Sequence, residues 1–364
     1  MQILTQIIVL LSWLAVPAAL VCIVDDWFLR PRRQIAAGRQ DAPTPLLAAL
    51  CYRVLPLLIA ASVVRLLFAD RLDFSLVLVI VTAVTGAVWW IDVALFRRRR
   101  QQAARAAGRD PAVVSEPGTV DYARSFFPVA LAVLVLRSFI FEPFRIPSDS
   151  MMPTLLDGDF IIVNKFVYGL RLPVINRKFL SIGEPQRGDV VVFRYPVDPG
   201  VNYIKRLVGL PGDRVQVVND RLIINGEPVP FEVVGTFSDG CYMNMHVAEE
   251  QLGEHRYSVM FCPVPLETTP LTPPGCNRKG VQGYYCADSS LIGVSSTAAS
   301  SRVYHVPEGH YLMIGDNRDN SDDGRYWGFV PESHLVGKAT RIWFNWDLQR
   351  SGGPNWSRIG NRIE

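Results

Sequence analysis

The sequence predicts a membrane-anchored protein of mixed class, in which amino-terminal transmembrane helices precede a mainly β domain. Hydrophobic residues make up 49% of the 364 residues and charged residues only 20%, which excludes a disordered chain and argues against a wholly soluble one. Long apolar stretches crowd the first hundred residues. From Asp159 onward, short β-rich runs separated by turn residues replace them, as a strand-dominated domain requires.

Four apolar stretches are interpreted as membrane helices. Three approach the roughly 20 residues that a helix needs to cross the hydrocarbon layer, and they run over Ile3–Val24, Pro45–Val64 and Phe74–Phe96. The fourth, Phe126–Leu136, is shorter and spans only if its flanking polar residues reach the interfaces. Buried core helices of a soluble protein are the alternative for all four. A cleaved signal peptide fits the first stretch poorly, because Met1–Gln6 has no basic side chain.

Loop charges predict the orientation, because short basic loops remain on the cytoplasmic side of a membrane. Arginines follow the first and third stretches, at Arg30, Arg32, Arg33 and Arg39 and at Arg97–Arg100, Arg105 and Arg109. The turn Asp70–Asp73 carries one arginine against two aspartates. Four crossings would place the amino terminus and everything after about Glu142 outside, whereas three would reverse the side of the β domain. Arg53, within the second stretch, is expected to face other helices or a polar cavity.

The β domain is predicted from short runs bounded by turn residues. These runs are Asp159–Asn164, Asp189–Tyr195, Asn202–Val208, Asp213–Val218, Tyr311–Ile314 and Val336–Phe344, with Arg221–Asn225 as the return strand of a hairpin. The segment from about Phe231 to Ser301 is rich in Gly, Pro, Ser and Thr without a clear period, and it is interpreted as an inserted subdomain or long loop region. Inspection finds no internal repeat.

Four of the six cysteines fall in this insert, at Cys241, Cys262, Cys276 and Cys286. If the insert lies outside, an oxidising compartment allows one or two disulfides among them. A zinc site is the weaker alternative, because the spacings contain no CxxC pair. Cys22 and Cys51 lie in membrane stretches and are interpreted as packing residues.

Candidate chemistry starts from two serines, Ser148 and Ser150, in a proline-bounded loop directly after the fourth stretch. A rigid loop with a capping serine is the structural alternative. A serine hydroxyl needs a neighbouring base, and none of the five histidines sits in a recognisable triad motif. Lys165 and Lys205 lie in strand-like apolar contexts, where burial can lower a lysine pKa enough to yield a neutral amine. Either lysine can instead be an ordinary strand residue whose ammonium reaches water.

Ordered motifs make the chemistry more specific. The chain carries, in this order, Arg137–Phe144, Pro147–Leu155, Arg187–Phe193, Tyr203–Arg206, Gly209–Asp213 and Gly315–Ser321. In order and spacing these segments resemble the signature boxes of bacterial type I signal peptidases, also called leader peptidases. The resemblance covers about Phe74 to the carboxyl terminus and is weakest at the insert. It implies a two-helix anchor in 71–143 and a catalytic domain in 144–230 and 302–364. Two additional helices in residues 1–70 and an inserted subdomain in 231–301 depart from the family pattern.

Residue by residue, the resemblance implies that Ser150 is the nucleophile and Lys205 its general base, which demotes Lys165. Ser148 matches the serine whose hydroxyl forms an oxyanion hole with the backbone amide of Ser150. Ser321 matches the serine that positions the lysine amine.

Further residues match the supporting and substrate-binding positions of the family. Asp323 and Arg325 match an acidic and basic pair with a structural role. Asp149 departs from the family pattern, which usually has a small residue between the two serines. The positions that match shallow apolar pockets for small substrate side chains are Phe144, Ile146, Met151, Leu155, Val192, Tyr203, Ile204, Met313 and Ile314.

The resulting hypothesis is a membrane-bound serine endopeptidase that cleaves signal peptides from exported preproteins with a Ser-Lys dyad. It implies the outer, periplasmic face of the bacterial cytoplasmic membrane, and signal peptides, membrane lipid and the export machinery as partners. No metal, organic cofactor or nucleic acid is expected. A penicillin-recognising acyltransferase is disfavoured, since that chemistry needs Ser-x-x-Lys and Met151, Met152 and Pro153 follow Ser150. An inactive scaffold that binds signal peptides without cutting them is the rival from another class.

Overall fold

The computed structural model describes residues 2–67, 74–218, 220–239, 242–262, 284–285, 302–347 and 353–364. The chain divides into two compact units, a helical unit of Met1–Val135 and a β-rich unit of Leu136–Glu364. The mainly β character predicted for the second half is confirmed. The predicted turn Asp70–Asp73 lies outside the described residues, so its side of the membrane stays a prediction.

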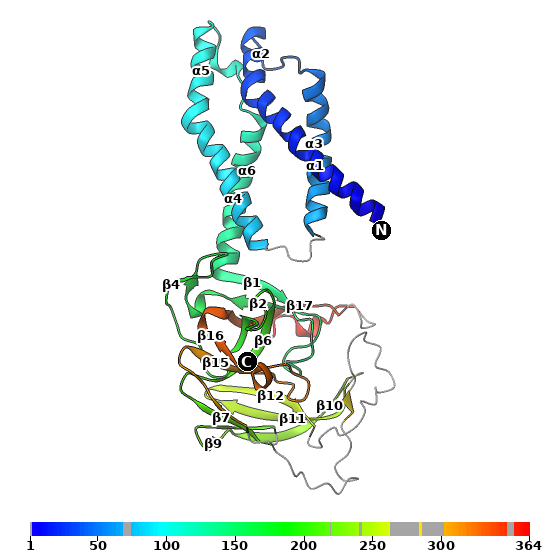
Figure 1. The fold of residues 1–364 in the computed structure, drawn as a ribbon, viewed down its shortest axis with the longest axis vertical. Helices are drawn as coiled ribbons and strands as arrows, with labels where there is room; N and C mark the ends of the chain where they lie inside the picture. The colour runs from blue at the N-terminus through cyan, green and yellow to red at the C-terminus, as the bar shows by residue number, and fades with distance from the viewer. Residues whose placement is uncertain are drawn as a thin grey trace. The chain divides into compact units, whose positions relative to one another are not determined.

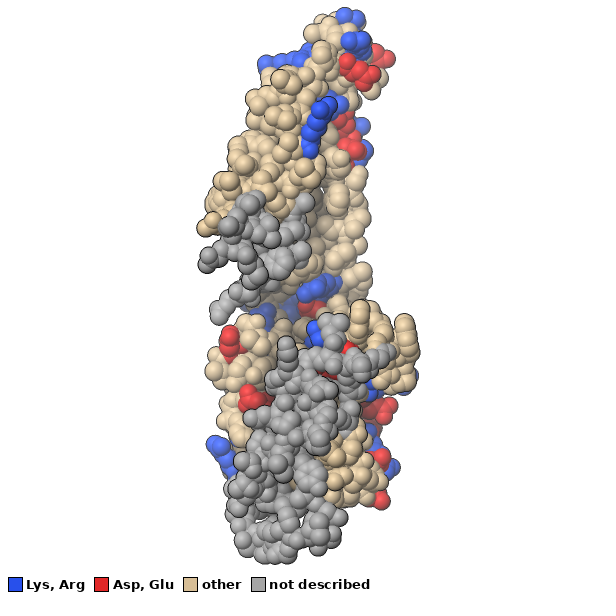
Figure 2. All heavy atoms as spheres, turned by 90° about the vertical axis from the view of Figure 1, so that its right-hand side faces the viewer, with Lys and Arg blue, Asp and Glu red and all other residues tan. Residues whose placement is uncertain are grey.

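Six α-helices form the described part of the helical unit. They are α1 (Gln2–Val24), α2 (Arg30–Ala37), α3 (Leu46–Leu67), α4 (Phe74–Ile91), α5 (Arg97–Ala106) and α6 (Gly118–Val135). Helix α1 packs against α3, and α4 packs against α6 (Figure 1). Basic side chains gather at the end of this unit that carries α2 and α5, while mostly uncharged side chains cover the rest of the visible face (Figure 2).

Three helical stretches within the described residues are long and apolar enough to cross a membrane: Val9–Ala37, Phe74–Ala106 and Gly118–Ile140. The fourth apolar run of the sequence therefore lies inside a longer candidate span than Phe126–Leu136 suggested. The second run contributes only a shorter apolar helix, Leu46–Ile59. Arg53 is exposed on α3, so its side chain is not buried against other helices.

The helical unit contains a repeat that inspection of the sequence missed. Each of α1 and α4 continues into a π-helical segment that starts with a buried aspartate, Asp25 or Asp92. Eight residues later, Arg33 donates to Asp25 at 2.7 and 3.0 Å, and Arg100 donates to Asp92 at 2.5 and 3.0 Å. We call α1 with α3 the first hairpin and α4 with α6 the second hairpin. The repeat is hard to see in the sequence because few polar positions recur and different apolar residues occupy the positions between them.

Polar side chains of the segment that follows α1 contact the start of α6 and the residues just before it. Asp26 accepts hydrogen bonds from the Thr119 backbone N–H at 2.9 Å and from its hydroxyl at 3.1 Å. Trp27 donates its indole N–H to the Thr119 hydroxyl at 2.7 Å, and Gln34 donates to the Ser115 hydroxyl at 2.8 Å. Asp26 therefore satisfies a backbone N–H at the N-terminus of α6 that has no partner within the helix.

The β-rich unit is built on a seven-stranded antiparallel sheet. Its strand order is β1 (Phe141–Arg145), β2 (Asp159–Asn164), β17 (Leu335–Asn345), β5 (Val190–Arg194), β6 (Asn202–Gly209), β15 (His310–Ile314) and β16 (Phe329–Pro331). In this register Lys205 of β6 is paired with Val191 of β5. The short helix α7 (Gly324–Trp327) lies between β15 and β16 in the chain.

Smaller sheets complete the described part of this unit. One has the order β14 (Val303–His305), β7 (Arg214–Val218), β8 (Arg221–Ile224) and β9 (Glu227–Pro228), which confirms the predicted hairpin. Another pairs β3 (Leu170–Arg171) with β4 (Lys178–Leu180). The third belongs to the insert and contains β10 (Phe231–Asp239), β11 (Tyr242–Leu252) and β12 (His255–Phe261), with β13 (Tyr284–Tyr285) parallel to β11.

The described part of the insert is thus a sheet rather than a long loop. Register shifts between Val233 and Gly235 and between Phe237 and Asp239 interrupt the alternation of β10. These irregularities hide a strand from a search for period two. Cys262, at the end of this sheet, is disulfide-bonded, which favours the disulfide alternative over zinc for this residue. The other three cysteines of the insert lie outside the described residues.

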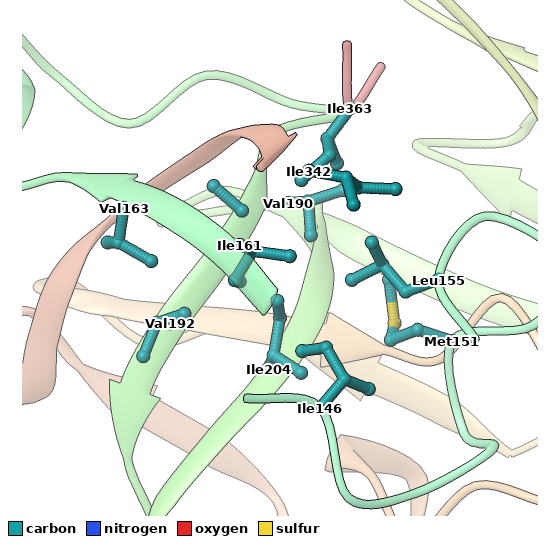
Figure 3. Close-up of a cluster of buried hydrophobic side chains, with 11 residues drawn as sticks. Ile146, Met151, Leu155, Ile161, Val163, Val190, Val192, Ile204, Ile342 and Ile363 are labelled. Atoms are coloured by element: carbon teal, nitrogen blue, oxygen red, sulfur yellow. The ribbon is translucent and has the colours of Figure 1, made fainter. Parts of the chain in front are cut away.

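A cluster of buried apolar side chains lies on the main sheet beside the loop that carries the two serines (Figure 3). It joins alternate residues of β2 and β5, such as Ile161 with Val163 and Val190 with Val192, to side chains from that loop. The members are Ile146, Met151, Leu155, Ile161, Val163, Val190, Val192, Ile204, Ala339, Ile342 and Ile363. Packing on both sides of Ser150 therefore fixes the backbone of the serine loop.

Candidate active site

Ser150 and Lys205 are in direct contact. The Lys205 Nζ lies 2.6 Å from the Ser150 Oγ, although 55 residues separate them in the chain. Lys205 sits within β6, where it pairs with Val191 of β5, and the next residue, Arg206, pairs with Ile314 of β15. Both side chains are buried, with 8% of Ser150 and 4% of Lys205 exposed.

Burial changes the proton affinity of Lys205. Desolvation lowers the pKa of its amine to about 8, against the opposing effect of Asp323, Asp322 and Asp316. The backbone carbonyl of Ile204 accepts a second hydrogen bond from the amine at 3.0 Å. A substantial fraction of Lys205 is therefore neutral near pH 8, and a neutral amine can accept a hydroxyl proton.

Lys165, the other lysine considered from the sequence, lies in a different environment. Its ammonium pairs with the Glu142 carboxylate at 3.0 Å, and Arg137 pairs with the same carboxylate at 2.7 Å. The Lys165 amine is therefore engaged by the Glu142 carboxylate, whereas the Lys205 amine contacts Ser150.

Ser148 lies on the accessible side of the serine loop, the segment that carries Ser148 and Ser150. Its side chain is exposed, and its Oγ is 3.4 Å from the Ser150 Oγ. A hydroxyl at this place can donate to an oxygen that develops negative charge next to Ser150.

The loop Gly315–Ser321 holds the backbone around Ser150. Asn317 donates its backbone N–H to the Ser150 carbonyl and its side-chain amide to the Asp149 carbonyl, both at 3.1 Å. A Cβ on Gly315 would lie 2.6 Å from the Ser150 carbonyl oxygen and would also collide with the Ser321 hydroxyl. Gly315 therefore permits the close approach that brings Ser321 and Ser150 together.

Asp323 and Arg325 hold the Gly315–Ser321 loop through hydrogen bonds. Asp323 accepts the Gly315 backbone N–H at 2.9 Å and the Arg325 Nε at 2.8 Å. Arg325 also donates to the Arg318 carbonyl at 2.7 Å. Although burial raises the pKa of Asp323, the hydrogen bonds from Arg325 hold it below its ordinary value, so the carboxylate stays charged.

Arg206 and Asp316 form a buried ion pair to which the sequence analysis assigned no role. The Arg206 Nε and Nη2 each donate to the Asp316 carboxylate at 2.7 Å. Asp316 also accepts the Thr154 hydroxyl at 2.5 Å. The pair thus joins β6, the Gly315–Ser321 loop and the serine loop. Both residues stood inside recognised motifs, and alternation along β6 was the signal that Arg206 points away from Lys205.

The predicted substrate-binding residues do not form one group. Five of them, Ile146, Met151, Leu155, Val192 and Ile204, belong to the cluster in Figure 3, and Phe144 packs against it. The remaining three pack elsewhere: Met313, with Tyr203 beside it, in a second buried cluster, and Ile314 in a third. Met151 and Leu155 have no exposed surface, so they shape the site from beneath rather than line an open pocket.

Comparison with known proteins places the chain in one family. A family model described as signal peptidase, peptidase S26, matches residues 119–344. A signal peptidase I from Pseudomonas aeruginosa is 44% identical over 310 residues, which cover 79% of this chain and 98% of that protein. A signal peptidase I from Haemophilus influenzae is 34% identical over 324 residues, which cover 79% of this chain and 90% of that protein. One from Aquifex aeolicus is 36% identical over 232 residues, covering 60% and 82% of the two chains. Together with the buried serine and lysine in contact, these matches show that the chain belongs to the signal peptidase I family of S26 peptidases.

Proposed function

We propose that this chain is a membrane-anchored serine endopeptidase that removes signal peptides, with Ser150 as nucleophile and Lys205 as general base. The observation that carries this proposal is the 2.6 Å contact between the two side chains, combined with a lysine pKa lowered to about 8. Membership of the signal peptidase I family supports signal-peptide cleavage as the reaction. The contact supports Ser150 and Lys205 as the residues that carry it out.

The proposed reaction starts with transfer of the Ser150 hydroxyl proton to the neutral amine of Lys205. The Ser150 oxygen then attacks the carbonyl carbon of the scissile peptide bond, and the carbonyl oxygen takes up negative charge. The Ser148 hydroxyl and the Ser150 backbone N–H donate to that oxygen; losing one such donor typically costs about 3 kcal/mol of transition-state stabilisation. The Lys205 ammonium protonates the leaving amine, and the regenerated base activates the water that hydrolyses the acyl-enzyme.

The proposed substrate is an extended segment with small side chains near the cleaved bond. Phe144 and Ile204 line the apolar surface next to Ser150 in this proposal, while the buried Ile146, Met151 and Leu155 limit its depth from below. A pocket of this kind discriminates by size, and one methylene group that does not fit costs about 1 to 3 kcal/mol. Met313, Ile314 and Tyr203 are proposed to act only through packing.

The proposed location is the outer face of the bacterial cytoplasmic membrane, with several helices crossing the lipid. The arginines of α2 and α5 support this orientation, which requires both α3 and α4 to cross the membrane between them. In this setting, membrane lipid surrounds the hairpins, and the export machinery delivers the preprotein to Ser150.

The experiment that tests the proposed dyad compares Ser150→Ala, Lys205→Ala and Lys165→Ala in the full-length protein in detergent. With a preprotein as substrate and product masses as readout, we expect the first two variants to lose activity by roughly 10³-fold or more, because nucleophile and base act as a unit. Lys165→Ala is the matched control, since it removes a lysine that pairs with Glu142, and its activity should stay within about threefold of the parent.

Two results would contradict the proposal. Cleavage retained by Ser150→Ala or by Lys205→Ala would exclude that residue from the dyad. A parent protein that binds the preprotein without producing the cut masses would instead favour the inactive scaffold.

A further inference from the structure

The residue between the two serines is tied to the insert. Asp149 is buried, with 5% of its surface exposed. The Tyr242 hydroxyl, at the start of β11, donates to the Asp149 carboxylate at 3.1 Å. The same hydroxyl accepts a hydrogen bond of 2.6 Å from the side-chain amide of Asn320, next to Ser321. One tyrosine of the insert thus connects the serine loop with the Gly315–Ser321 loop.

The backbone of the insert continues this connection. The Met260 N–H of β12 donates to the Asp316 carbonyl, and the Arg318 N–H donates to the Met260 carbonyl, both at 2.8 Å. The Cys262 N–H donates to the Asp319 carboxylate at 2.5 Å. Strand β12 therefore pairs directly with the loop whose Asn317 holds the Ser150 carbonyl.

A buried ion pair fixes the insert to the same loop. The Arg318 guanidinium contacts both oxygens of the Glu250 carboxylate, and neither side chain has more than 2% of its surface exposed. The Tyr257 hydroxyl donates to Glu250 at 2.7 Å. A doubly hydrogen-bonded pair of this kind allows little change in the relative position of β11 and the loop.

Apolar packing joins the insert to the residues just after the nucleophile. Met152, two residues beyond Ser150, is fully buried in a cluster with Tyr242, Met245, Met260 and Cys262. Four of these five side chains come from the insert. The serine loop therefore has the main-sheet cluster on one flank, through Met151 and Leu155, and the insert on the other.

We propose that Tyr242 is a positioning residue for catalysis, which acts through the Asp149 carboxylate to hold the Ser150 hydroxyl against Lys205. The insert then forms part of the frame of the active site. This proposal rests on the role proposed above for Ser150. Its physical reason is the steep dependence of reaction rate on geometry, since a displacement of about 1 Å at the reacting atoms can cost about 10²-fold in rate.

The test is a double-mutant cycle of Tyr242→Phe and Asp149→Ala in the full-length protein in detergent, with a preprotein peptide as substrate. Each single variant should lower kcat about tenfold, with KM changed by less than about twofold, because a hydrogen bond behind the reacting groups is lost while the substrate contacts remain. The double variant should also lose about tenfold, because both changes remove the same contact. A loss near hundredfold would mean independent effects and would overturn the proposal.

Tyr168→Phe is the matched control for the loss of a buried hydroxyl. Tyr168 is also buried, and it donates to the Asp189 carboxylate at 2.7 Å. We expect its melting temperature to fall as that of Tyr242→Phe does, while its kcat per folded molecule stays within about twofold of the parent. An equal loss of kcat in Tyr168→Phe would assign the Tyr242 effect to general destabilisation.

Two further variants keep the outcomes separable. If Tyr242→Phe does not fold, Asn320→Ala takes its place in the cycle with Asp149→Ala, with the same expectation that the losses do not multiply. Ser150→Ala is assayed in parallel: an active Ser150→Ala refutes the proposed nucleophile. An inactive Ser150→Ala beside an unchanged Tyr242→Phe refutes only the positioning role.

Discussion

At the residue scale, the neighbouring basic residues Lys205 and Arg206 of β6 have different partners because a strand directs them to opposite faces. Lys205 contacts Ser150, whereas Arg206 pairs with Asp316 and lies 3.6 Å from the centre of the Tyr257 ring. Successive side chains of a strand point to opposite faces, so one face receives the reactive amine and the other a fixed ion pair. Against the effect of burial, the Asp316 carboxylate stabilises the charged form of Arg206 and raises its pKa, while burial disfavours the charged form of Lys205. The different roles of Lys205 and Arg206 therefore follow from their surroundings rather than from their residue types.

The lowered pKa of Lys205 predicts the pH dependence of cleavage. Only the neutral amine can accept the Ser150 proton, so kcat/KM should rise with pH, with a midpoint of about 8 set by the lysine. The measurement is kcat/KM from pH 6 to 10 in detergent, with a peptide substrate that has no group titrating in that range. A rate independent of pH over this range would contradict the assignment of Lys205 as the base.

Some features of the site could be predicted from sequence motifs, whereas contacts between distant residues could not. Ser150 and Lys205 were predicted because ordered motifs place them in a family with a known dyad. The contacts of Arg206 with Asp316 and of Tyr242 with Asp149 were not predicted. These partners are 110 and 93 residues apart, and nothing local specifies which cation meets which carboxylate. Such pairs are determined by how separate elements pack, which a single sequence does not show.

At the scale of elements, the close approach of two loops depends on Gly315. The Ser150 carbonyl and the Ser321 hydroxyl occupy the space that a side chain would need. The Gly315–Ser321 loop can therefore lie directly against the Ser150 backbone, while Asp323 accepts the Gly315 backbone N–H.

Substituting Gly315 by alanine should disrupt this contact. The added methyl group would collide with backbone at Ser150, so we expect cleavage to fall by about 10²-fold or more through displacement of the nucleophile. Gly235→Ala is the control, because a Cβ there meets nothing within 4 Å. The measurements are kcat/KM and thermal unfolding of both variants. Full activity in Gly315→Ala would show that the loop can retreat without moving Ser150.

Elements differed in how well their sequences revealed them. Five strands of the main sheet, β2, β5, β6, β15 and β17, were predicted because their ends carry turn residues and their runs are β-branched. The short strands β1 and β16 of the same sheet were not predicted. Strand β11 was missed, since it contains Met, Ala, Glu and Gln, which have little preference for strands. Its burial alternates only from Ala248 to Leu252, and pairing with β10 and β12 rather than local preference makes it a strand.

At the scale of the whole molecule, two units of different physical character share one chain. The helical unit exposes large apolar side chains such as Trp13, Leu57 and Trp90, which lipid would cover. The β-rich unit buries its apolar residues in several clusters. The candidate membrane spans were predictable from length and hydropathy, whereas the similarity of the two helix pairs became visible only from the positions of Asp25 and Asp92.

Reporter fusions test the orientation proposed for the chain. Fusions after Arg39 and Arg109 should report the cytoplasm, because both points follow arginine-rich helices that remain inside. A fusion after Ile146 should report the outside, next to the serine loop. The readout is a pair of reporters, one active only in the cytoplasm and one only after export. A cytoplasmic signal at Ile146 would contradict the proposed site of action.

The repeated hairpin has a consequence for how such a chain can change. A hairpin whose two helices both cross a membrane returns the chain to the side from which it started. Gaining or losing one therefore changes the number of crossings by two and leaves the sidedness of everything downstream unaltered. A single added helix would invert it and separate Ser150 from its substrate. The ion pairs Asp25–Arg33 and Asp92–Arg100 thus identify two similar hairpins. If both helices of a hairpin cross the membrane, adding or removing that hairpin keeps the β-rich unit on the same side.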